Sequence, residues 1–131
     1  MRNALRITLV LASVQVFAMA AADSHAQVRQ AYKQYIYVLR PAQRLHDSKA
    51  WTKQDNDAVA KHFARLQEAT KQGKVILAGR TDEPLDKTFG LVLFEAENDE
   101  AARQFMETDP TIVAGVMSAT LHPYSVALLR K

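Results

Sequence analysis

Two side chains in this sequence have the chemistry for proton transfer, His62 and Asp109. A histidine changes its charge near physiological pH, and small changes in burial or partners decide its state. An aspartate can hold an imidazole in one tautomer and stabilise its protonated form. Such a pair acts as a general acid or base, which is typically worth roughly 10² to 10⁴ in rate. We therefore take His62 and Asp109 as candidate catalytic residues, with Asp109 as the partner of the imidazole.

Each of these residues also has a purely structural interpretation. His62 lies three residues after Val59 and four before Leu66, so it falls on or beside an apolar helical stripe, where a backbone carbonyl could satisfy it. Asp109 precedes Pro110, and aspartate followed by proline is a good start for a helix. One carboxylate oxygen is enough to cap a helix, so Asp109 can serve both roles. The spacing leaves both interpretations open.

The remaining polar groups form weaker patterns. His46, His62 and His122 lack the spacing of metal ligands, and residues 55–57 lack the rest of a calcium loop. Arg80 follows an apolar run and could bind an anionic substrate near a pocket, although a solvated arginine is the simpler interpretation. The chain has no cysteine, which excludes disulfides, thiolate metal sites and cysteine nucleophiles. We expect no cofactor and no metal.

Composition indicates one ordinary globular domain. The 131 residues are 48% hydrophobic and 24% charged, and the net charge is only +3. Acidic and basic residues alternate along the chain, as in residues 82–87. Because no basic stripe is present, we expect no binding to nucleic acid.

Residues 1–26 have the pattern of a secretory signal peptide. Arg2 and Arg6 precede an apolar run over residues 7–20, and small residues then offer cleavage sites after Ala20, Ala22 or Ala26. The alternative is an uncleaved membrane anchor, but the run is shorter than the roughly 20 residues that span a bilayer. We expect a mature domain over residues 27–131 that is periplasmic or secreted and free of the membrane.

The mature chain has the pattern of an α+β fold with the order β-α-β-β-α-β, the ferredoxin-like split βαβ. A proline inside the last strand predicts that this strand lies at a sheet edge. The first helix has an apolar stripe that includes Phe63 and ends at Gly73. The predicted strands cover residues 33–40, 74–78, 89–95 and 117 to about 129. The first predicted helix starts at residue 53 or 56 and ends at 72. The second covers residues 99–107 after a cap at Asn98, and a short third helical turn follows Pro110.

Two predicted strands, residues 33–40 and 89–95, carry apolar side chains on both faces. Two helices can cover only one face of a four-stranded sheet. A second subunit packed against the other face would explain the remaining apolar side chains, so we predict a homodimer that packs sheet to sheet.

Five short runs occur in order along the chain: HFARL at 62–66, QGK at 72–74, AGR at 78–80, TDP at 108–110 and AGV at 114–116. Together they resemble the YciI-like (YCII-related) family over residues 34–128. The resemblance implies a ferredoxin-like fold, dimeric α+β barrels, and a histidine–aspartate active site that matches His62 and Asp109. One member of similar architecture is a dehydrochlorinase that acts on a chlorinated hydroxyquinol. The sequence departs from the family pattern at Val59 and Ala60, where arginine and proline are frequent, and at Arg80, where proline is frequent.

Two classes of function follow from this pattern. In the first, the protein is a small enzyme in which His62, oriented by Asp109, moves a proton on a small organic molecule. The pocket would lie between the first helix and the sheet, and the reaction would be of the lyase, isomerase or dehydrochlorinase type. In the second, the protein is a non-catalytic module that binds a small ligand, or a structural dimer.

Overall fold

The computed structural model describes residues 32–130, and the structural statements below concern this part of the chain. The signal peptide predicted for residues 1–26 lies outside it. Two short 3-10 helices, Gln43–Leu45 and Ser48–Ala50, lie between the first strand and the first helix. The other elements are β1 (Lys33–Pro41), α1 (Lys53–Lys71), β2 (Val75–Arg80), β3 (Gly90–Ala96), α2 (Asp99–Glu107), α3 (Pro110–Val113) and β4 (Met117–Tyr124).

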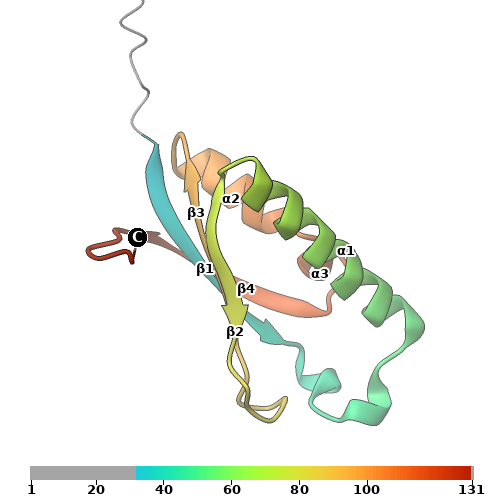
Figure 1. The fold of residues 1–131 in the computed structure, drawn as a ribbon. Helices are drawn as coiled ribbons and strands as arrows, with labels where there is room; N and C mark the ends of the chain where they lie inside the picture. Colours follow the sequence, from blue (N-terminus) through green and yellow to red (C-terminus); the bar gives the residue numbers. More distant parts are fainter. Residues whose placement is uncertain (1–31, 131) are drawn as a thin grey trace, which may run out of the picture.

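The four strands form one antiparallel sheet in the order β2-β3-β1-β4. The helices pack on one face of this sheet, α1 against β2, and α2 against β3 and β4 (Figure 1). The predicted α+β class with a four-stranded antiparallel sheet is therefore confirmed. Strand β4, which contains Pro123, lies at the sheet edge as its proline predicted.

Local capping fixes where the two long helices begin. Thr52 caps α1: its hydroxyl accepts from the backbone N–H of Asp55, and the Asp55 carboxylate accepts from the N–H of Thr52. Arg44 donates two hydrogen bonds to the same carboxylate, at 2.6 and 3.1 Å. Asn98 caps α2 as predicted, because its side chain accepts from the N–H of Ala101 at 2.8 Å.

The loop before α1 is closed by Trp51, which packs back on the domain. Its indole N–H donates to the carbonyl of Leu45 at 3.0 Å, and its ring packs against a small cluster made by Leu45, Ala58 and Val116. The tryptophan is therefore part of the core. It fixes the direction from which the chain enters α1.

The main core lies between the helices and the sheet. It is filled by alternate residues of β1 and β3, because successive side chains of a strand point to opposite faces. Phe94 packs against three other aromatic rings of this core. The core residues are Tyr35, Tyr37 and Leu39 of β1, Val92, Phe94 and Ala96 of β3, and Leu66, Ala69, Val75, Ala102, Phe105 and Met106.

The predicted apolar stripe of α1 is confirmed at Leu66 but wrong at Phe63. Phe63, which we placed on the buried face, is 62% exposed. The buried residues of α1 are Asp55, Ala58, Leu66 and Ala69, and these four define its inward face. Position 62 falls between Ala58 and Leu66 on this inward face, so the correction moves His62 further into the domain.

The last strand is shorter than predicted. It ends at Tyr124, whereas the prediction extended it to about residue 129. Strand β4 is hydrogen-bonded to β1 alone, and the pairing of Gln34 with Tyr124 lies at the start of β1. The residues that follow have no strand to pair with, and Leu128 is 94% exposed. The second strand also differs, since β2 covers Val75–Arg80 rather than residues 74–78.

Candidate active site

The structure brings His62 and Asp109 together between α1 and α3. Nδ1 of His62 lies 2.7 Å from Oδ2 of Asp109. His62 comes from the middle of α1, and Asp109 is the residue that caps α3. The Asp109 side chain is fully buried, whereas the imidazole keeps 13% of its surface exposed. The pair therefore has one buried charged end and one end that reaches solvent.

Asp109 accepts hydrogen bonds on both carboxylate oxygens. Oδ2 accepts from the hydroxyl of Tyr37 at 3.0 Å, in addition to its contact with His62. Oδ1 accepts from the backbone N–H of Thr111 at 2.9 Å and from the Thr111 hydroxyl at 2.7 Å. The carboxylate thus caps α3 with one oxygen and contacts the imidazole with the other. The two roles that the sequence left open coexist in one side chain.

These contacts decide the charge of the buried carboxyl group. Burial acts to raise the pKa of Asp109, but the hydrogen bonds from His62 and Thr111 outweigh it and lower the pKa to about 2. Burial raises the pKa of Tyr37, and the neighbouring Asp109 carboxylate raises it further. Near neutral pH the aspartate is therefore ionised and the phenol is a neutral donor.

The ionised carboxylate also assigns the tautomer of His62. A carboxylate can only accept hydrogen bonds, so Nδ1 must carry the proton that lies between His62 and Asp109. In the neutral imidazole Nε2 is then unprotonated and can take a proton from another molecule. When it does so, the positive charge forms beside Asp109. The arrangement has the geometry of an oriented general base.

Arg65 fixes the position of α1 beside this pair. It lies three residues after His62, and its Nη2 donates to the carbonyl of Phe105 at 2.9 Å and to the hydroxyl of Thr108 at 2.8 Å. Thr108 directly precedes Asp109 in the chain. One arginine therefore ties the helix that carries the histidine to the segment that carries the aspartate.

Sequence reasoning missed Tyr37 and Thr111 as parts of the site. A signal for Thr111 was present, because a threonine two residues after a capping aspartate is placed to donate to it. Tyr37 carried a weaker signal. It lies on the inward face of β1 between Tyr35 and Leu39, and a buried tyrosine hydroxyl needs a polar partner. Which partner it finds depends on the packing of α3 against the sheet.

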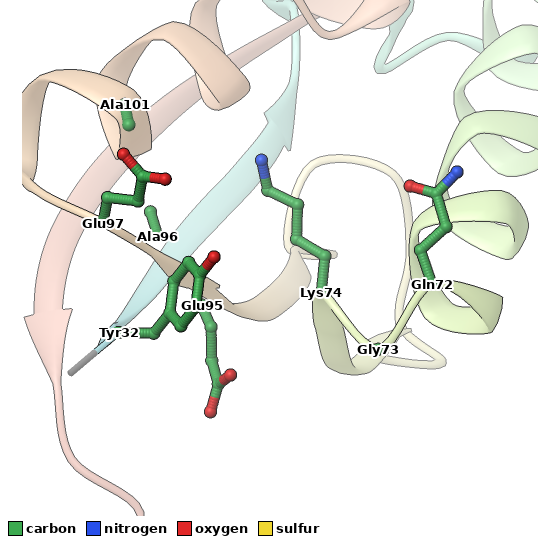
Figure 2. Close-up of a pocket in the computed structure, with 8 residues that line it drawn as sticks. All are labelled: Tyr32, Gln72, Gly73, Lys74, Glu95, Ala96, Glu97 and Ala101. Atoms are coloured by element: carbon green, nitrogen blue, oxygen red, sulfur yellow. The ribbon is translucent and has the colours of Figure 1, made fainter. Parts of the chain in front are cut away.

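Two hollows in the described part of the chain lie away from the pair. They have volumes of about 450 and 370 Å³. The first lies at the end of α1 near Gly73 and Lys74 (Figure 2), and the second lies between α2 and β4 near Arg103 and Thr120. Neither is lined by His62 or Asp109. The pocket predicted between α1 and the sheet stays a prediction.

Arg80, the weak candidate for substrate binding, lies at the exposed end of β2 opposite Gly90. It lines neither hollow. Within residues 32–130 there is no group of three or more histidine or acidic side chains that could hold a metal ion. The same residues contain no helix that is long and apolar enough to cross a membrane.

The sequence and structure were compared with those of known proteins. No curated protein matches the sequence significantly. A similar solved structure is the 5-chloro-2-hydroxyhydroquinone dehydrochlorinase TftG from Burkholderia phenoliruptrix AC1100, in complex with 2,5-dihydroxybenzoquinone. It is 16% identical, with a TM-score of 0.48, and the match covers 70% of this chain and 93% of that one. The profile of one family, described as the YCII-related domain, matches residues 36–121. The chain therefore belongs to the family of proteins with a YCII-related domain.

Proposed function

We propose that the protein is a small enzyme that transfers protons on a small organic molecule, with His62 as the general base or acid and Asp109 as its positioning partner. The observation that carries this proposal is the 2.7 Å contact between Nδ1 of His62 and the buried carboxylate of Asp109. The reaction class is that of a lyase, isomerase or dehydrochlorinase. We propose the form of these reactions that begins with removal of a proton from the substrate.

Each side chain of the site has a defined part in this chemistry. Nε2 of His62 accepts the substrate proton, and the resulting imidazolium is stabilised by the adjacent negative charge. Asp109 stays ionised throughout, because its low pKa prevents it from taking the proton from the ring. Tyr37 and Thr111 hold the carboxylate in place with their hydroxyl groups. The imidazolium then returns the proton to the product or to the leaving group.

The proposal includes a homodimer and export from the cytoplasm. The sheet face that is turned away from the helices carries Ile36, Val38 and Leu91, which are half-buried, and Leu77, which is 52% exposed. A second copy packed on this face would cover them, and a small-molecule substrate would then be bound by a dimer. The periplasmic or secreted location depends on the signal peptide expected at residues 1–26. Light scattering at micromolar concentration tests the dimer, and a monomer there would contradict it.

The catalytic proposal is tested by exchange chemistry with a matched control. The protein is incubated in D₂O with a panel of small ketones, hydroxy acids and chlorinated hydroquinones, and NMR records deuterium entry into carbon positions and loss of chloride. We expect His62→Gln to lose activity by roughly 10²-fold or more. His46→Gln changes an exposed histidine in the loop before α1 and should keep full activity. Equal activity in both variants would refute the role of His62.

A second experiment tests the pair without a substrate. The ring-nitrogen signals of His62 are recorded by NMR in the wild type and in Asp109→Asn. Removing the carboxylate should weaken the preference for a proton on Nδ1, which the 2.7 Å contact with Asp109 imposes. An unchanged tautomer would mean that Asp109 acts as a helix cap only.

One observation favours the alternative, a binding or structural dimer module. The described hollows do not include the pair, and an enzyme needs space for its substrate beside the reacting nitrogen. Asp109 also has a complete structural role as the cap of α3. If Asp109→Asn lowers stability but leaves the tautomer of His62 as it was, this alternative replaces the catalytic proposal.

A further inference from the structure

The larger hollow contains a lysine in an unusual setting. Lys74 follows directly after Gly73, the glycine with φ of +76° at the end of α1, and it lines the hollow of about 450 Å³ together with Tyr32, Glu95 and Glu97. Its Nζ lies 4.2 Å from the centre of the Phe105 ring. Figure 2 shows the Glu97 carboxylate and the Tyr32 hydroxyl turned toward the space beside the lysine, and the Glu95 carboxylate turned away.

A second cation lies close to this lysine. The guanidinium carbon of Arg65 lies 4.4 Å from the centre of the same Phe105 ring. None of the salt bridges found within residues 32–130 includes Lys74. Burial lowers the pKa of Lys74, Arg65 lowers it further, and Glu97 opposes them with a smaller effect. The amine is thus half-buried, close to another cation, and open to a hollow.

We propose that Lys74 is a nucleophilic amine that condenses with the carbonyl group of a small aldehyde or ketone bound in this hollow. Amines that carry out such chemistry in proteins are made reactive by desolvation or by a neighbouring cation, and Lys74 has both. The hollow also supplies a carboxylate, Glu97, and a hydroxyl, Tyr32, for moving protons. This site is separate from the His62–Asp109 pair and does not depend on the function proposed for it.

The reaction balances without any oxidant or reductant. The lone pair of the neutral Nζ attacks the carbonyl carbon, so that the C–N bond forms as the π bond of the carbonyl group breaks. One of the two hydrogens on the nitrogen moves to the oxygen as a proton and gives a carbinolamine. The hydroxyl group then leaves as water after protonation, and the nitrogen loses its remaining hydrogen as a proton. Lysine and carbonyl compound thus give an imine and water. We assign to Glu97, which lines the same hollow, the transfer of these protons from nitrogen to oxygen.

Reductive trapping tests this proposal. The purified protein is treated at about pH 7 with benzaldehyde or propanal and sodium cyanoborohydride, and mass spectrometry of peptides measures the rate at which each lysine is modified. Lys71 is the matched control, since it lies three residues earlier at the exposed end of α1. We expect Lys74 to react at least about threefold faster than Lys71 despite its lower exposure. A rate at Lys74 equal to or below that at Lys71 would overturn the proposal.

Two further measurements separate the proposed cause from simple accessibility. The ratio of the Lys74 rate to the Lys71 rate should fall as the pH rises, because the lowered pKa of Lys74 gives no further advantage once its amine is largely neutral. A ratio that stays constant with pH would contradict the proposal. His62→Gln should leave the rate of Lys74 modification unchanged. A lower rate of Lys74 modification in this variant would show that the hollow is not an independent site. Failure of the proton-transfer assay alone has no bearing on this result.

Discussion

The His62–Asp109 pair and the hollow at Lys74 lie along the same helix but are organised in opposite ways. At the pair, a fully buried carboxylate accepts hydrogen bonds on both oxygens and is held by three side chains. At the hollow there is space, and the lysine stacks on an aromatic ring without an ion-pair partner among the described residues. The first region fixes groups in one geometry, and the second leaves a reactive group accessible. Stability measurements should therefore separate them.

Asp109→Ala is expected to have the largest effect. It removes the acceptor of His62, Tyr37 and Thr111 together, and it leaves buried donors without partners. Each buried donor that is left without a partner costs about 1–3 kcal/mol, so the loss of three contacts should exceed that of any single-donor variant. Denaturant unfolding measures the loss. Asp99→Ala is the control, because Asp99 is largely exposed and should cost far less even though Tyr35 donates to it. If both variants lost the same free energy of unfolding, burial of the carboxylate would not explain the effect of Asp109→Ala.

Acid should destabilise the protein through the same carboxylate. The pKa of Asp109 falls from its ordinary 3.8 to about 2 in the folded protein, so the unfolded chain binds this proton more readily. The stabilisation is then present above about pH 4 and is lost as the pH falls toward 2, and it amounts to about 2 kcal/mol. Free energies of unfolding at several pH values measure this loss. In Asp109→Asn this part of the acid dependence should disappear, whereas the part that comes from Asp55, whose pKa is lowered by hydrogen bonds with Arg44 and Thr52, should remain. An identical pH profile would contradict the assignment.

Tyr37→Phe should have a moderate effect. The variant keeps the ring that packs against Phe94 and Phe105 but removes the hydroxyl that donates to Asp109. Because Asp109 retains its contacts with His62 and Thr111, the expected cost is about 1 kcal/mol. Tyr35→Phe removes a hydroxyl bonded to the exposed Asp99 and should cost less. A cost as large as that of Asp109→Ala would mean that Tyr37, rather than the aspartate, holds the site together.

Much of the fold was predictable because local signals agreed with one another. Short apolar runs marked the strands, Asn98 marked the start of α2, and Pro123 marked the sheet edge. The end of β4 was not predictable in this way. It is set by where β1 begins, and no feature within residues 117–129 contains that information.

The candidate site likewise combines features that local sequence signals predict with features that only the packed structure decides. Residue type and spacing singled out His62 and Asp109 as candidates. The same pattern predicted that Phe63 is buried, because a large apolar side chain is expected on the buried face of a helix, whereas Phe63 is exposed. A helix turns by about 100° per residue, so two adjacent stripes can each have helical spacing. The small residues Ala58 and Ala69 decide between them, because they allow α1 to pack closely. Tyr37 comes from a strand distant in sequence, and only the packed structure brings its hydroxyl to Asp109.

The smallest effect is expected at the hollow, for Lys74→Met. The substitution keeps a flexible apolar chain against Phe105 and removes an ammonium that has no ion-pair partner among the described residues. Because no partner is left with an unpaired buried charge, we expect the free energy of unfolding to change by no more than about 0.5 kcal/mol. Arg65→Met is the informative comparison on the same ring. It removes the donor to Phe105 and Thr108, and it should be clearly destabilising. If Lys74→Met were as costly as Arg65→Met, the lysine would be a structural contact of Phe105, and its accessibility at the hollow would be incidental.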